Sequence, residues 1–194
     1  MLWVLSAYSQ QLSQASVGGG IAPSFLLAHR PDLKNLAAHN IGYEIGYEQD
    51  FSSTNWGQYY SQPNLGYSLL VYNLGRAETG WAIGGLLTTR FHLAGNSKNS
   101  LSFRMGAGLG YLTKKFETFD NRRNQAIGSH INGNLQFALL YRKTFKNYYI
   151  EPGIGIAHYS NAAWSMPNLG YNIPGVMLRC GYSFEKPLNI QDTA

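Results

Sequence analysis

A histidine and a serine lie two residues apart near the C-terminal end of the chain, at His158 and Ser160. They continue an alternating segment in which Ile150, Ile154 and Ile156 share one face of a predicted β-strand. Residues two apart on a strand are about 6.6 Å apart on the same face, so the imidazole can approach the hydroxyl. A serine beside a histidine base is the minimum for nucleophilic attack on an ester carbonyl. From spacing alone, the favoured interpretation is that both residues only mark the polar end of the strand. The alternative is that the pair belongs to an ester hydrolase.

The composition narrows the kind of protein that carries this pair. The chain has 194 residues, which suits one domain, and 13% of them are charged while 14% are aromatic. Soluble domains have about 25% charged residues. No apolar run approaches the ~18 residues of a membrane helix. This combination is typical of a transmembrane β-barrel.

The net charge of +5 points only weakly to an anionic partner. No basic run is long enough to indicate nucleic acid as that partner. The single Cys180 excludes an intramolecular disulfide.

Alternation of apolar and polar residues predicts eight β-strands. Each is about a dozen residues long, which exceeds the ~5–6 residues common in globular sheets and suits a tilted membrane strand. The predicted strands cover residues 17–29, 39–48, 65–73, 81–93, 100–111, 130–142, 148–160 and 173–184.

The residues on the non-apolar face of each predicted strand distinguish a barrel from a soluble β-sandwich that serves as a binding module. They are mostly Gly, Ser, Asn and Gln, which make a poor water-facing surface but a suitable lining for a narrow barrel. We therefore predict an all-β fold, an eight-stranded antiparallel transmembrane β-barrel. The residues expected outside are Phe103, Leu109, Ile131, Phe137, Ile154 and Ile156, and those expected inside are Arg104, Asn132, Asn134 and Gln136. The charged residues expected to pair inside are Glu44, Arg90, Arg104, Arg142, Glu151 and Arg179.

The N-terminal residues 1–9 resemble the end of a secretory signal. A short apolar run precedes Ala7-Tyr8-Ser9, which has the small residues of a cleavage site. We therefore expect a truncated signal-peptide remnant at 1–9 and a single barrel domain at 10–194. The alternative is an ordinary frayed terminus.

The segment HYSNAAWSMPNLGYN, from His158 to Asn172, resembles the signature of the lipid A 3-O-deacylases of Gram-negative outer membranes. In that family, H-Y-S-N is followed by a short linker, P-N-x-G and a Glu. The resemblance implies an eight-stranded barrel in the bacterial outer membrane. It also implies hydrolysis of the ester that holds the 3-position acyl chain of lipid A, by a Ser-His-Glu triad on the lipid-facing wall.

The resemblance assigns roles to individual residues. It implies that Ser160 is the nucleophile and His158 the base. Asn168 matches the Asn of the oxyanion hole, and with Asn161 it is expected to bind the oxyanion or substrate. Asn172 stands where the family has Glu. By parity on the last strand it faces outward beside His158, where an amide oxygen can hold the imidazole tautomer but adds no charge.

The sequence thus predicts an outer-membrane esterase that acts on lipid A or lipopolysaccharide, with outer-membrane lipids as its partners and no cofactor or metal. The alternative is a non-catalytic barrel of the same ancestry that binds lipid or has a structural role, because Asn172 departs from the family pattern.

The remaining candidates are weaker. His29, His39, His92 and His130 show no metal-ligand spacing. A predicted outer loop contains four basic residues that could meet lipid phosphates or simply be solvated: Lys114, Lys115, Arg122 and Arg123.

Overall fold

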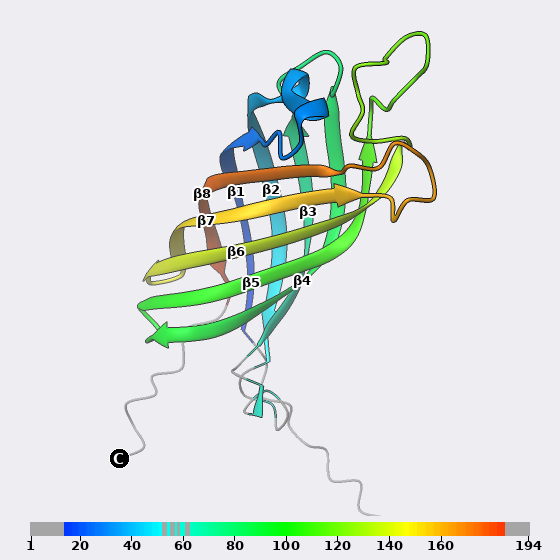
Figure 1. Ribbon diagram of the computed structural model, residues 1–194. Helices are drawn as coiled ribbons and strands as arrows, with labels where there is room; N and C mark the ends of the chain where they lie inside the picture. The colour runs from blue at the N-terminus through cyan, green and yellow to red at the C-terminus, as the bar shows by residue number, and fades with distance from the viewer. Residues whose placement is uncertain (1–13, 52–53, 55–56, 58, 61–62, 185–194) are drawn as a thin grey trace, which may run out of the picture.

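The computed structural model describes residues 14–51, 54, 57, 59–60 and 63–184. The expected signal remnant at 1–9 lies outside these residues. The described residues form a closed barrel in which each strand pairs with the next and the first pairs with the last (Figure 1). The elements are β1 (Ala15–Leu26), the 3-10 helix η1 (Pro31–Leu36), β2 (Ala38–Asp50), β3 (Asn64–Asn73), β4 (Trp81–Gly95), β5 (Asn99–Leu112), β6 (Ile131–Phe145), β7 (Tyr148–Ser160) and β8 (Tyr171–Ser183). The barrel prediction is confirmed, and each strand lies within a few residues of its predicted position.

The two faces of the strands are divided as alternation predicts. Leu109 on β5 is 67% exposed on the outer wall, whereas Arg104 on the same strand is 1% exposed in the interior. On β6, Asn132, Asn134 and Gln136 are buried inside. The outer wall is therefore apolar and the interior polar, the reverse of a soluble domain.

The interior is filled by a network of ion pairs. Glu151 lies 2.6 Å from each of Arg90, Arg142 and Arg179. A buried charge is costly unless it is paired, and here every carboxylate has more than one guanidinium partner. The six residues expected to pair inside do so. The sequence interpretation missed a seventh member, Glu48. It lies on the same inward face of β2 as Glu44, and its carboxylate is 2.8 Å from Arg90.

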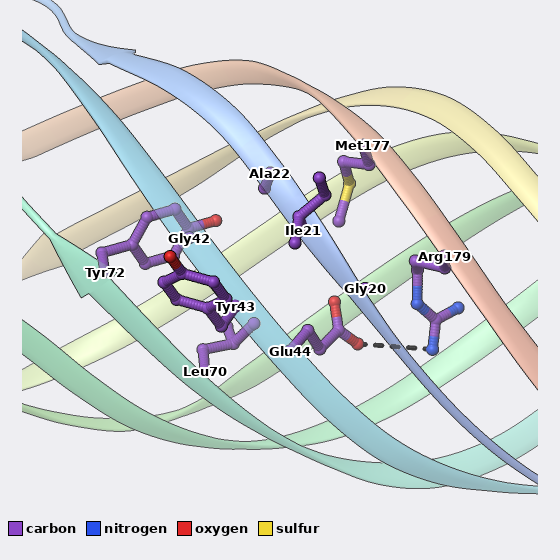
Figure 2. Close-up of a pocket in the computed structure, with 10 residues that line it drawn as sticks. All are labelled: Gly20, Ile21, Ala22, Gly42, Tyr43, Glu44, Leu70, Tyr72, Met177 and Arg179. Atoms are coloured by element: carbon purple, nitrogen blue, oxygen red, sulfur yellow. Dashed lines mark ion pairs between the residues drawn. The ribbon is translucent and has the colours of Figure 1, made fainter.

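The interior offers no room for a ligand at the pocket drawn in Figure 2. This pocket is lined mainly by inward-facing residues of β1, β2, β3 and β8, and an ion pair of 3.4 Å joins Glu44 to Arg179 beside it. The space among its side chains does not hold even a water molecule. A second pocket, near Ser24 and Gln136, has about 10 Å³, roughly the limit for one water. Neither of these two interior pockets has room for a substrate.

The two ends of the barrel differ. The connections 27–37, 74–80, 113–130 and 161–170 gather at one end, while 96–98 and 146–147 are tight turns at the other (Figure 1). Long loops belong to the outer side and short turns to the inner side of such barrels. The loop that follows His158 and Ser160 thus lies at the outer end.

In the part of the chain that the structure describes, no helix is long and apolar enough to span a membrane.

The ion-pair network predicts a large effect of Glu151→Ala on stability. Removing Glu151 leaves three guanidinium groups short of a partner, two of them fully in the interior, which costs about 3–5 kcal/mol. Urea unfolding of the protein in detergent micelles measures this loss. The matched control is Glu117→Ala, which removes a surface ion pair of 2.6 Å with Lys115 and should change the midpoint little. Equal midpoints for the two variants would contradict a structural role of the interior network.

Candidate functional site

The strand register of β7 and β8 places two of the predicted site residues side by side. His158 and Asn172 are direct cross-strand neighbours. Tyr159, next to His158, is fully buried inside the barrel, so His158 and Asn172 face outward by alternation. Ser160 is the last residue of β7 and shares this outer face. The site therefore lies on the outer wall where it meets the loop end.

The hydrogen bond between His158 and Asn172 fixes the state of the imidazole. His158 Nδ1 lies 2.7 Å from Asn172 Oδ1. Because an amide oxygen only accepts, Nδ1 carries the proton and donates it. The other nitrogen, Nε2, then has its lone pair available as a base. The expected contact between Asn172 and His158 is present.

Ser160 is bonded to Asn168 and not to His158. Its hydroxyl donates to Asn168 Oδ1 over 3.2 Å, and the backbone N–H of Asn161 donates to the same oxygen over 3.0 Å. The hydrogen bonds of the described residues include none between Ser160 and His158. The Ser160 hydroxyl must turn away from Asn168 before His158 can take its proton, as is common in sites without substrate.

Asn161 organises the loop rather than facing outward with its side chain. Its amide donates to Ser129 Oγ over 2.8 Å and to Ser165 O over 2.9 Å, and the residue is 3% exposed. Its Oδ1 accepts from the backbone N–H of Ala163. Only the backbone N–H of Asn161 is directed to the Ser160–Asn168 pair, so any role in binding an oxyanion falls to the main chain.

The backbone after Asn161 has an unusual conformation. Ala162 and Ala163 have φ of 54° and 63°. Such left-handed conformations cost about 1–3 kcal/mol for a residue with a Cβ, and they persist where the surroundings demand them. Here they turn the chain so that the Ala162 N–H points to Ser160 Oγ at 3.4 Å. Two main-chain donors thus lie beside the serine.

Gly170 completes the site and was not among the predicted site residues. A Cβ at this position would lie 3.0 Å from His158 Cε1, and φ is +77°. Only glycine accepts this φ without strain and leaves room for the ring. Its place in the P-N-x-G motif was the available signal. Its N–H donates to Ala126 O over 3.0 Å, which anchors this end of the loop.

The last residues of the loop 113–130 support the site loop 161–170, and Figure 1 shows the two loops meeting near the end of the barrel. A β-bridge joins Ile127 to Asn168, and Ser165 donates to Gly128 O over 2.8 Å. At the start of β8, Tyr171 donates to Asn124 Oδ1 over 2.9 Å. These contacts between distant segments gave no local sequence signal.

Two of the other histidines that were weighed as metal ligands, His130 and His39, pack against neighbouring aromatic rings. His130 stacks on Tyr111 and contacts Leu112 O, while His39 packs on Phe25. The described residues contain no group of three or more His, Cys, Asp or Glu side chains that could hold a metal ion.

The basic residues of the outer loop are partly paired with acidic ones. Arg123 lies 3.5 Å from Glu78 and Lys115 lies 2.6 Å from Glu117. The hydrogen bond and positive charge of Lys115 hold the pKa of Glu117 below its usual value.

Comparisons with known proteins show the family and the fold of the chain. The family model described as lipid A 3-O-deacylase (PagL) matches residues 41–181. The crystal structure of the outer membrane enzyme PagL superposes with a TM-score of 0.56 and 13% identity, covering 84% of this chain and 97% of that chain. The crystal structure of Neisserial surface protein A (NspA) gives a TM-score of 0.58 and 9% identity, covering 85% and 95%. At these identities the two structures show the fold alone. No curated protein sequence matches the chain significantly.

The site geometry predicts that Gly170→Ala is harmful in two ways. Alanine at this φ costs about 1–2 kcal/mol, and its Cβ presses on the His158 ring. We expect a lower urea midpoint and altered ¹⁵N shifts of the His158 ring nitrogens in NMR spectra. The matched control is Gly85→Ala on the outer wall of β4, where the nearest atom to a Cβ is 3.9 Å away. An unchanged midpoint and unchanged histidine shifts in Gly170→Ala would contradict this prediction.

Proposed function

We propose, since the chain belongs to the lipid A 3-O-deacylase family, that it hydrolyses an ester-linked acyl chain of lipid A in the bacterial outer membrane. The protein is an outer-membrane β-barrel. The observation that carries the proposal is the hydrogen bond of 2.7 Å by which Asn172 holds His158 as a base, with Ser160 two residues away on the same outward face.

In the proposed reaction, Ser160 Oγ attacks the ester carbonyl while His158 Nε2 takes the hydroxyl proton. The negative charge that develops on the carbonyl oxygen needs hydrogen-bond donors. The main-chain N–H groups beside Ser160 are those of Asn161, which donates to Asn168 Oδ1 here, and of Ala162, which donates to Ser160 Oγ. Asn168 presents its oxygen to Ser160, so its amide has to turn before its N–H can serve as a third donor. The ester C–O bond breaks as His158 gives this proton to the departing sugar oxygen, which leaves the acyl chain on Ser160. A water molecule then gives a proton to His158 and attacks the acyl-Ser160 ester, and the proton passes to Ser160 Oγ as the fatty acid leaves.

The position of the site on the outer wall suits a substrate that is itself a membrane lipid. Ile154 and Ile156 continue the outward face of β7 below His158, and both are exposed. An acyl chain can lie against them without leaving the bilayer. The polar side chains of the site bond to one another, which avoids the cost of several kcal/mol for an unpaired polar group near hydrocarbon.

A second candidate function is a non-catalytic barrel of the same ancestry. Two observations favour it: Asn172 supplies no charge to an imidazolium, and Ser160 is bonded to Asn168 instead of His158. The two candidates differ in whether lipid A loses an acyl chain, so one measurement separates them.

Mass spectrometry of lipid A incubated with the protein in detergent micelles is the decisive experiment. We expect the loss of one acyl chain with the parent protein and no loss with Ser160→Ala or His158→Ala, because residues that act as a unit lose nearly all activity together. Ser100→Ala, at the opposite end of the barrel, is the matched control and should retain activity. Intact lipid A with a folded parent protein would favour the non-catalytic barrel. Activity retained in Ser160→Ala would remove Ser160 as nucleophile.

Replacing Asn172 by the family residue gives a second test. Asn172→Glu should raise turnover, because a carboxylate adds charge stabilisation of the imidazolium to the orientation that the amide already provides. Asn172→Ala should lower turnover by releasing the ring. The rate of acyl release per folded barrel is the measurement. An Asn172→Glu variant no faster than the parent would show that the missing charge does not limit the rate.

A further inference from the structure

A second histidine, His29, contacts the site from the opposite end of the sequence. It lies in the segment between β1 and η1 and is exposed. Its Nδ1 is 3.1 Å from Asn172 Nδ2, and its Nε2 is 3.0 Å from Leu169 O. Asn172 is therefore held between two imidazole rings, that of His158 on one side and that of His29 on the other.

The hydrogen bonds that link Leu169, His29, Asn172 and His158 are consistent with only one assignment of donors and acceptors. Leu169 O can only accept, so His29 Nε2 carries a proton and donates it. The neutral ring then has its lone pair at Nδ1, where it accepts from the Asn172 amide N–H. This leaves Asn172 Oδ1 to accept from His158 Nδ1. The order runs from Leu169 through His29 and Asn172 to His158, and it ends with a free lone pair at His158 Nε2.

The backbone holds His29 in this place independently of its side chain. The N–H of Leu27 donates to Asn172 O over 2.9 Å, and the N–H of His29 donates to Leu27 O over 3.1 Å. The segment after β1 is thus fastened to the first turn of β8. A change of the His29 side chain can alter the hydrogen-bond order without removing this attachment.

An amide at position 172 has a problem that a carboxylate does not have. A carboxylate presents two equivalent oxygens, whereas an amide presents an acceptor on one side and a donor on the other. If the Asn172 amide turned over, its N–H would face His158 Nδ1. That nitrogen would then have to accept, the proton would move to Nε2, and the lone pair needed for catalysis would be lost.

We propose that His29 is a positioning residue that selects the orientation of the Asn172 amide and so the tautomer of His158. This inference rests on the proposed esterase function for its effect on turnover, but the tautomer itself can be observed without activity. His29 acts through Asn172 and touches no reacting atom. His29 determines which side of the Asn172 amide faces His158. A carboxylate, with two equivalent oxygens, would not need this.

Two substitutions separate the hydrogen bond from the shape of the ring. His29→Phe keeps a ring of similar size but has no acceptor. His29→Asn places an amide oxygen near the position of Nδ1 and is the conservative rescue. Loss of one hydrogen bond is worth about 1 kcal/mol, so we expect kcat to fall about fivefold to tenfold in His29→Phe, with little change in KM. His29→Asn should recover most of that loss. The matched control is His39→Phe, a histidine that packs on Phe25 outside the site.

The background Asn172→Asp distinguishes positioning from a general structural role. Aspartate has the size of asparagine but two equivalent oxygens, so the orientation no longer has to be selected. His29→Phe should therefore cost much less in Asn172→Asp than in the parent. An equal loss in both backgrounds would overturn the proposal in favour of a structural contact.

NMR of ¹⁵N-histidine-labelled protein in micelles reads the tautomer directly. We expect His158 to be protonated at Nδ1 in the parent and in His29→Asn, and a mixture of Nδ1 and Nε2 forms in His29→Phe. An unchanged His158 tautomer in His29→Phe would overturn the proposal. If the parent releases no acyl chain, the proposed function fails, while the tautomer shift in His29→Phe still supports this inference.

Discussion

Closure of the sheet is the constraint on which the site depends. A bilayer offers no water to unpaired backbone groups, so a membrane sheet has to pair its first strand with its last. Here β1 pairs with β8 from Ser16 opposite Ser183 to Ser24 opposite Gly175. The hydrogen bond from Leu27 to Asn172 continues this seam beyond the ladder. The closure brings His29 beside Asn172, although the two residues are far apart in the sequence.

The buried ion pairs fix the register between β7 and β8, the two strands that carry the site. Glu151 on β7 and Arg179 on β8 are cross-strand neighbours, and their ion pair is 2.6 Å long. His158 and Asn172 are cross-strand neighbours further along the same ladder. A slip of one residue would move every side chain to the other face and separate the inner pair as well as the outer one. The charged interior therefore sets the register that aligns the histidine with its amide partner on the outer wall.

The parts of this structure that follow a local period could be predicted from the sequence. The eight strands, their faces and the contact of His158 with Asn172 all follow from alternation and the parity of one hairpin. The loop contacts of Asn161 with Ser129 could not, because they depend on a segment elsewhere in the chain and on left-handed backbone at Ala162.

His29 carried no signal of its own in the sequence. It was considered only as a metal ligand, and its partner Asn172 is 143 residues away. The catalytic roles of Ser160, His158, Asn168 and Asn172 remain proposals that rest on the family and on this geometry.

Asparagine and glutamate at position 172 solve different physical problems. A carboxylate stabilises the imidazolium through its charge, but an ion beside a lipid-facing wall loses hydration, which is expensive when its partner is neutral for most of the cycle. An amide avoids that cost and gives up the charge stabilisation. It also gives up symmetry, and a second hydrogen-bonding group has to set its direction. His29, held by the backbone at Leu27 and bonded to Leu169 O, is placed to set it. Asparagine at 172 and histidine at 29 therefore fit together as a pair. The Asn172 amide needs an acceptor that fixes its direction, and the lone pair at His29 Nδ1 needs a donor, which the Asn172 N–H supplies.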